Sequence, residues 1–166
     1  MAIENKIIDN FLSEEEYLKI KYMMLDDWRN FPWFYTPSVA SENDNDIYFV
    51  HTFQEKELDL ESPYLHKLHS ILKKMNIDDL WRVKGNLFPN QNKFIEHDAH
   101  IDYDEPHQAA IYYINTNNGY TKLKDGTKVD SVANRLLLFN GSEYHSSTNC
   151  TNDKIRVNIN FNYISK

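Results

Sequence analysis

The sequence predicts a mainly β protein of the α+β class, with two helices in its N-terminal part. Residues 155–161 alternate apolar and polar side chains, which is the period of a strand with one buried face. Asp125-Gly126 separates two further strand-like segments and is a strong signal for a tight hairpin. The two helix-start signals, at Ser13 and Ser62, both precede residue 80.

The first helix is expected to begin after Ser13, because Ser13 and Glu16 have the spacing of a capping box. Its apolar face, widened by Leu18 and Leu25, continues at helical spacing through Tyr17, Ile20, Lys21, Met24 and Trp28. The second helix is expected to run from Ser62-Pro63, with Ser as N-cap and Pro in the first turn, to about Met75.

An aromatic segment, residues 31–37, and a polar run, residues 41–46, lie between the two helices. Loops on a rigid scaffold often carry recognition, so this region could form a substrate lid. Burial against the strands explains Trp33 and Phe34 equally well, and both interpretations stay open.

Three strand-like segments carry the polar residues of interest. Residues 93–102 lack helical periodicity and follow Pro89, which favours a strand. Residues 136–139 form a continuous apolar run closed by Asn140-Gly141, as in a buried strand. Residues 120–124 and 127–132 flank the predicted hairpin turn and complete a β-meander.

His100, Asp102 and His145 are the candidate metal ligands. In a strand, His100 and Asp102 point to the same face, and His145 follows the buried run at residues 136–139. Two imidazoles and one carboxylate form a facial triad that suits non-haem Fe(II) and leaves coordination positions open. A His-x-Asp tripeptide alone is a weak motif, and polar residues at a strand end are the simpler alternative.

Arg156 adds a fixed cation to this set. It shares the polar face of residues 155–161 with Asn158 and Asn160. On a strand with one solvent-exposed face, such a row of polar residues is ordinary. Inside a barrel, however, an arginine needs an anionic partner. A small dicarboxylate would satisfy it.

These residues, with Ile-Tyr-Tyr-Ile-Asn at 111–115 and Asn-Arg-Leu-Leu-Leu-Phe at 134–139, resemble the 2-oxoglutarate/Fe(II) dioxygenases of the prolyl 4-hydroxylase-like branch. The match runs in order from about Leu80 to Tyr163. It implies a double-stranded β-helix (jelly roll, cupin-like), braced here by the two N-terminal helices. It also implies Fe(II), 2-oxoglutarate as cosubstrate and O₂, with C–H hydroxylation coupled to formation of succinate and CO₂; ascorbate is a candidate reductant.

The resemblance also assigns roles by position. His100, Asp102 and His145 match the iron ligands, Arg156 matches the residue that pairs with the distal carboxylate of 2-oxoglutarate, and Tyr113 matches a tyrosine that bonds the same carboxylate. Core packing is the alternative for Tyr113 and the preferred role for Tyr112.

The chain departs from the family pattern where Phe88 precedes Pro89, a position that often holds a cosubstrate-binding tyrosine. Asn86, on the same strand face, could supply a polar contact instead, or be a satisfied strand asparagine. The Trp that often follows the Tyr-Tyr-x-Asn run is missing, and the usual Gly-Gly pair is reduced to Asn118-Gly119. These losses put in doubt any transfer of peptidyl-proline preference.

Four other histidines are expected to lie outside the candidate metal ligands. His66 and His69 fall at i, i+3 without an evident third metal ligand, so a solvated or capping role is preferred. His97 is expected to face away from His100, near the site or on the surface, and His107 to lie in an exposed loop at the barrel mouth. No Ser-His-Asp order or His-Glu-x-x-His helix supports a hydrolase.

Length and composition predict one domain over residues 1–166. The resemblance implies a jelly-roll catalytic core in 80–166, with helical support and a substrate loop in 1–79. The net charge of −7 argues against a nucleic-acid partner, and Asn162 stands where nucleic-acid demethylases of the superfamily usually carry a second arginine. No apolar run is long enough for a membrane helix. A single cysteine, Cys150, and the absence of a signal-peptide pattern favour the cytoplasm, that of a host if the chain is bacteriophage-encoded.

The expected activity is therefore a 2-oxoglutarate- and Fe(II)-dependent hydroxylase acting on a prolyl or other protein side chain, as a monomer or homodimer. A free amino acid or small metabolite is the alternative substrate. A jelly-roll module that binds metal without turnover is the alternative class, although a binder has no need for a dicarboxylate partner such as Arg156.

Overall fold

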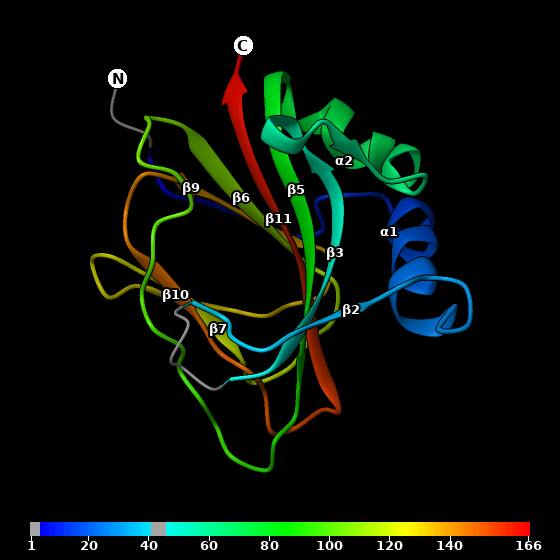
Figure 1. Cartoon of the computed structure of the whole chain (residues 1–166), viewed down its shortest axis with the longest axis vertical. Helices are drawn as coiled ribbons and strands as arrows, with labels where there is room; N and C mark the ends of the chain where they lie inside the picture. The colour runs from blue at the N-terminus through cyan, green and yellow to red at the C-terminus, as the bar shows by residue number, and fades with distance from the viewer. Residues whose placement is uncertain (1–3, 41–45) are drawn as a thin grey trace.

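Two antiparallel sheets form the structure, a computed structural model that describes residues 4–40 and 46–166 (Figure 1). In the large sheet the described strands follow the order β1-β9-β6-β11-β5-β3-β2, with β4 paired to β3. Their bounds are β1 Lys6–Ile8, β2 Phe34–Thr36, β3 Tyr48–Glu55, β4 Leu60–Glu61, β5 Ile77–Pro89, β6 Gln108–Tyr113, β9 Arg135–Asn140 and β11 Ile155–Ser165. The small sheet has the order β10-β7-β8, formed by β7 Tyr120–Leu123, β8 Lys128–Asp130 and β10 His145–Ser147.

The helices lie in the N-terminal part, as predicted, and cover one side of the large sheet (Figure 1). The capping box is present at α1 (Glu14–Lys21), which continues as a π-helical turn, η1 (Tyr22–Asp26). Because this turn ends the helix at Asp26, Trp28 falls outside it and is 72% exposed, so its expected place on the apolar face was wrong.

The second helical segment begins later than expected. The Ser62 hydroxyl accepts from the Tyr64 N–H, but Pro63 lies in a turn, and helical structure starts with the 3₁₀ segment η3 (Leu65–Leu68). The α-helix α2 (His69–Met75) then ends at Met75, where Asn76 adopts the left-handed conformation. A further 3₁₀ turn, η2, spans Lys56–Leu58. None of the described helices is long and apolar enough to cross a membrane.

The core has two parts, one on each face of the large sheet. Val157, Ile159 and Phe161 of β11 join the helices in the first part. The second part lies between the sheets, where Ile111 and Phe139 of the large sheet meet Leu123 and Val129 of the small sheet. Packing between two sheets confirms the predicted jelly-roll class and encloses the polar face of β11.

The predicted strand at residues 93–102 was wrong. This segment forms only isolated bridges to the small sheet, at Glu96–Thr148 and His100–His145. Glu96 and His100 are four residues apart, whereas their partners Thr148 and His145 are three residues apart. The segment therefore contains one extra residue, as in a β-bulge. The insertion breaks the alternation and turns His97 inward, where it is 4% exposed.

The predicted hairpin is confirmed between β7 and β8, with Gly126 at a φ of +88° in the turn. The buried strand is confirmed as β9, with Leu136 and Leu137 almost fully buried. In the 31–37 segment, Trp33 packs against the core, whereas Phe34 is 59% exposed on β2. The polar run beyond it lies outside the described residues at 41–45.

Candidate metal centre

His100 and His145 face each other across an isolated antiparallel bridge. The His100 N–H donates to the His145 carbonyl at 2.9 Å, and the His145 N–H donates to the His100 carbonyl at 3.0 Å. Residues that exchange both hydrogen bonds project their side chains to the same face, so the two imidazoles meet, with ring centroids 4.7 Å apart.

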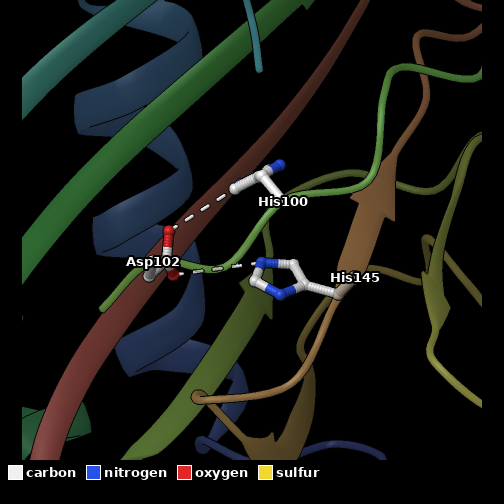
Figure 2. A group of neighbouring side chains, drawn as sticks. All are labelled: His100, Asp102 and His145. Atoms are coloured by element: carbon white, nitrogen blue, oxygen red, sulfur yellow. Dashed lines mark ion pairs between the residues drawn. The ribbon is translucent and has the colours of Figure 1, made fainter. Parts of the chain in front are cut away.

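Asp102 lies beside the two rings and faces both of them (Figure 2). Its Oδ1 is 3.8 Å from His100 Nε2, and its Oδ2 is 3.9 Å from His145 Nε2. One ligand atom from each of the three residues lies within 4.8 Å of the other two. Among the described residues, this is the cluster of histidine and acidic side chains that could hold a metal ion. The structure thus brings together the three predicted ligands.

Asp102 is held in place by three neighbouring side chains. Arg82 Nη2 lies 2.6 Å from Oδ1, and Oδ2 accepts from Asn160 Nδ2 at 3.0 Å and from Asn162 Nδ2 at 2.9 Å. Burial disfavours the charged carboxylate, but the Arg82 guanidinium and the other cationic and amide groups outweigh burial and hold the pKa of Asp102 well below its usual range. Asp102 is therefore an anion at any pH of interest.

The histidines offer lone pairs to a cation. His100 Nδ1 lies 3.5 Å from the Asp98 carbonyl, and His145 Nδ1 lies 3.2 Å from the Glu143 carbonyl. A proton on each Nδ1 leaves Nε2 as the free ligand atom, the usual arrangement around a bound metal. Burial, together with the nearby His145, lowers the pKa of His100, which favours the neutral ligand form. Because 3.8–3.9 Å is under twice a metal–ligand bond of about 2.1 Å, the donor set fits a transition ion.

Arg156 is fully buried on the same polar face of β11. It donates from Nε to Ser131 Oγ at 2.7 Å, from Nη1 to the Thr148 carbonyl at 3.1 Å, and from Nη2 to Thr121 Oγ1 at 3.3 Å. Within residues 4–40 and 46–166 it has no carboxylate partner. Burial lowers the pKa of Arg156 to about 10, which leaves it cationic at neutral pH.

A buried positive charge is stabilised by an anion. Two of the five guanidinium N–H groups make no described hydrogen bond and could donate to such an anion. Tyr113 lies beside the guanidinium, 5.8 Å from ring centroid to Arg156 Cζ. Its hydroxyl donates to Thr121 Oγ1 at 2.8 Å, and burial raises the pKa of Tyr113, so it stays a neutral donor. Tyr112 points to the opposite core and bonds Asn134, which agrees with its expected packing role.

A cavity opens beside the three candidate ligands, lined among others by Lys84, Asn86, Phe88 and Asn158. Asn86 Nδ2 donates to Asn158 Oδ1 at 3.0 Å, so Asn86 both faces the cavity and satisfies a strand neighbour. Phe88 separates the cavity from Arg156, whose Cζ lies 5.4 Å from the Phe88 ring centroid. The Phe88 ring also stacks on Tyr48.

Lys84 belongs to the same cavity wall. It shares one face of β5 with Arg82, Asn86 and Phe88, and it pairs with Asn160 of β11. Burial lowers the pKa of Lys84 to about 8, so the ammonium is charged at neutral pH. Asn86 was predicted from the sequence, whereas Arg82 and Lys84 were missed, although both follow the same period of two along the strand.

Other histidines lie where local packing places them. His107 was expected to be exposed but is 2% exposed, because it stacks on Trp81 and bonds Asn162. His97 stacks on Phe88 and bonds Ser147 Oγ at 2.9 Å. His66 and His69 are exposed, as expected.

Comparison with known proteins places the fold. No protein-family model matches the sequence, and no curated protein matches it. Among solved structures, the chain is similar to a prolyl hydroxylase from Trichoplax adhaerens, in complex with a hypoxia inducible factor oxygen degradation domain peptide fragment. The identity is 19% and the TM-score 0.68, covering 97% of this chain and 83% of that one.

Two further structures have the same fold. A viral collagen prolyl hydroxylase from Paramecium bursaria Chlorella virus-1, solved as its 2-oxoglutarate complex, is 12% identical with a TM-score of 0.62, covering 96% of each chain. The epimerase SnoN, with Fe³⁺, α-ketoglutarate and nogalamycin RO, is 10% identical with a TM-score of 0.69, covering 98% of this chain and 79% of that one. At these identities the likeness establishes the fold.

Proposed function

We propose that the protein is a 2-oxoglutarate- and Fe(II)-dependent oxygenase that hydroxylates a C–H bond and converts 2-oxoglutarate and O₂ to succinate and CO₂. The observation that carries the proposal is the fully buried Arg156, without a carboxylate partner among the described residues, on the strand that also supports Asp102. A metal-binding module without turnover has no use for such a cation.

Each residue has a defined task in this proposal. His100, Asp102 and His145 would hold the Fe(II), which supplies O₂ activation when bound. Arg156, with the Tyr113 hydroxyl beside it, would bind the distal carboxylate of 2-oxoglutarate. Asn160 and Arg156 are four residues apart on β11, about 13 Å of strand, which their side chains and a five-carbon diacid can span together.

The polar side chains around Asp102 would keep its carboxylate ionised and oriented. Among the described residues, Oδ1 faces Arg82 alone and keeps a lone pair for a metal, whereas Oδ2 already accepts from both asparagines. Phe88, stacked on Tyr48 and His97, would exclude water from Arg156. Exclusion of water strengthens the carboxylate–guanidinium interaction.

The fold neighbours support two substrate classes. One neighbour was solved with a peptide fragment, which favours a prolyl or other protein side chain as the substrate. Another was solved with nogalamycin RO, and the free ammonium of Lys84 in the cavity favours a free amino acid or other small metabolite as the second candidate.

The first experiment is anaerobic addition of Fe(II) and 2-oxoglutarate to the purified protein. We expect a weak visible absorption band from the iron–cosubstrate complex, which disappears in His145→Ala. For Arg156→Ala we expect iron binding to persist while 2-oxoglutarate affinity falls by roughly 100-fold or more, as expected for a lost buried charge pair. A folded wild type without a band would favour the non-catalytic binder.

The second experiment is aerobic turnover, measured as succinate, against a panel of proline-containing peptides and free amino acids. Stimulation by the peptides supports the protein substrate, and stimulation by amino acids alone supports the second candidate. His145→Ala is the control for succinate formed without the metal centre.

A further inference from the structure

Lys84 is a cation in the cavity of the candidate metal centre, and within the described part of the chain it has no anionic partner. Its side chain lines the cavity together with His100 and Asp102. Among the described residues it forms no ion pair, and its described contact is with the Tyr48 ring, at 5.9 Å from Nζ to the centroid. That distance is near the outer limit for a cation–π interaction, so Tyr48 compensates the charge weakly.

The nearby carboxylates are already used. Asp102 is paired with Arg82 at 2.6 Å and accepts from two asparagines. Glu55 also favours the Lys84 charge, but its Oε1 accepts from the Tyr103 hydroxyl at 2.9 Å and it makes no described ion pair with Lys84. Lys84 is thus the unneutralised cation of this part of the cavity.

The local charge is positive when the site is loaded. Arg82 and Lys84 contribute two positive charges, Asp102 and Glu55 contribute two negative charges, and the two histidines are neutral ligands. A divalent metal adds two positive charges, and one carboxylate of 2-oxoglutarate removes one. An excess of positive charge is left beside the metal, which favours an anionic group on whatever else enters.

Lys84 is also at the wrong end for the distal carboxylate of 2-oxoglutarate. On β5 it pairs with Asn160, whereas Phe88 pairs with Arg156. Four residues separate these two positions, which is about 13 Å along the strand. An anion bound by Lys84 therefore lies near the metal and away from Arg156.

We propose that Lys84 binds a carboxylate of the hydroxylated substrate, so that the substrate carries its anionic group close to the oxidised carbon. This inference rests on the proposed function and narrows its substrate class to carboxylates. The carboxylate can belong to a free amino acid or to a peptide with an acidic or C-terminal residue, and both are covered by the test.

The experiment uses the anaerobic protein with Fe(II) and 2-oxoglutarate, and it measures the visible band and the melting temperature. The probes are L-amino acids and short prolyl peptides, each as free acid and as matched primary amide, up to millimolar concentration. We expect acids to shift the band and raise the melting temperature, and amides to have little effect. An effect of free amino acids identifies a small-molecule source, and an effect of peptide acids alone identifies a peptide source.

Lys84→Met should weaken binding of the active acid probe by roughly 10- to 100-fold, the usual effect of losing a hydrogen bond to a charged group. Lys84→Arg should retain part of it, and Lys67→Met, which removes an exposed lysine on η3, should behave as wild type. The affinity for 2-oxoglutarate should be unchanged in Lys84→Met.

Three results would overturn the inference: equal responses to acids and amides, a Lys84→Met protein that responds as wild type, or no response to any acid. Loss of 2-oxoglutarate affinity in Lys84→Met would also overturn it, by assigning Lys84 to the cosubstrate. Failure of the proposed function is distinct, because the band itself would then be missing before any probe is added.

Discussion

Arg156 and Lys84 show how a single residue can reveal a ligand. Each is a cation on the inner face of the large sheet, and neither has a carboxylate partner among the described residues. Burying an uncompensated charge is costly, so such residues persist where a bound anion offsets the cost. The two cations are therefore assigned to two different anions, one in the cavity beside the metal ligands at Lys84 and one behind Phe88 at Arg156.

Gly119 makes room for the Arg156 side chain. A Cβ at this position would collide with Arg156 Cδ and lie 2.6 Å from the Asn149 carbonyl oxygen. We expect Gly119→Ala to displace Arg156, lowering stability by about 1–3 kcal/mol and weakening 2-oxoglutarate binding in the anaerobic titration. Gly126→Asn, at the open hairpin tip, is the control that should leave cosubstrate affinity unchanged. Normal affinity in Gly119→Ala would mean that Arg156 has no part in binding.

Lys84 gives a pH dependence with a defined sign. Its pKa is about 8 in the folded protein, below the value of about 10.4 expected for an unfolded chain. Between these values the unfolded state binds more protons, so the free energy of unfolding contributed by Lys84 rises with pH. The free energy of unfolding of the wild type, relative to that of Lys84→Met, should therefore rise by on the order of 1–3 kcal/mol between pH 8 and about 10.4. Urea unfolding of both proteins measures this, and a constant difference across that range would contradict it.

At the scale of elements, β11 supports the site through a row of carboxamides. Asn158, Asn160 and Asn162 alternate with the core residues Val157, Ile159 and Phe161, so one strand completes the packing on one face and the polar site on the other. Central pairing with both β5 and β6 fixes the register of this row. The candidate metal ligand Asp102, which lies in a loop, is positioned by its hydrogen bonds to this strand.

We expect Asn162→Leu to weaken metal binding by roughly 10-fold or more, because residues that orient a ligand usually have effects of this size. The substitution removes one of the two amide donors to Asp102 Oδ2 and the Asn162 contact of His107 Nε2. Titration with Co(II), followed by absorbance, measures the affinity. Unchanged affinity in a folded variant would show that Arg82 and Asn160 suffice to orient Asp102.

The capping box of α1 is expected to act on stability alone. Ser13 Oγ accepts from the Glu16 N–H at 3.4 Å, and Glu16 Oε2 accepts from the Ser13 N–H at 3.1 Å. Ser13→Ala should lower the free energy of unfolding by about 1 kcal/mol and leave the iron–cosubstrate band intact. Chemical denaturation and the anaerobic titration separate the two effects. A changed band would reveal coupling between α1 and the site.

For the whole molecule, patterns of local period predicted the fold well. The alternation in β11, the turn at Gly126 and the capping box at Ser13 each depend on a few neighbouring residues, and each has the predicted structure. The triad was also predicted from sequence, where the ordered resemblance to the dioxygenase family singled it out, since the His-x-Asp spacing alone is a weak motif.

The remaining features depend on contacts between distant segments. The extra residue between Glu96 and His100 is evident only when the segment is paired with Thr148 and His145. The burial of His97 therefore could not be predicted from the local sequence. His107 is buried because Trp81 and Asn162, from two other strands, close over it. The pairing of Arg82 with Asp102 likewise joins β5 to a loop.

The most direct test of the central claim is a crystal structure of the protein with Mn(II), as a redox-inert substitute for Fe(II), and 2-oxoglutarate. The account predicts anomalous density bonded to His100 Nε2, Asp102 and His145 Nε2, with the distal carboxylate of 2-oxoglutarate on the Arg156 guanidinium. A metal held by other residues, or a cosubstrate that leaves Arg156 without an anion, would contradict it.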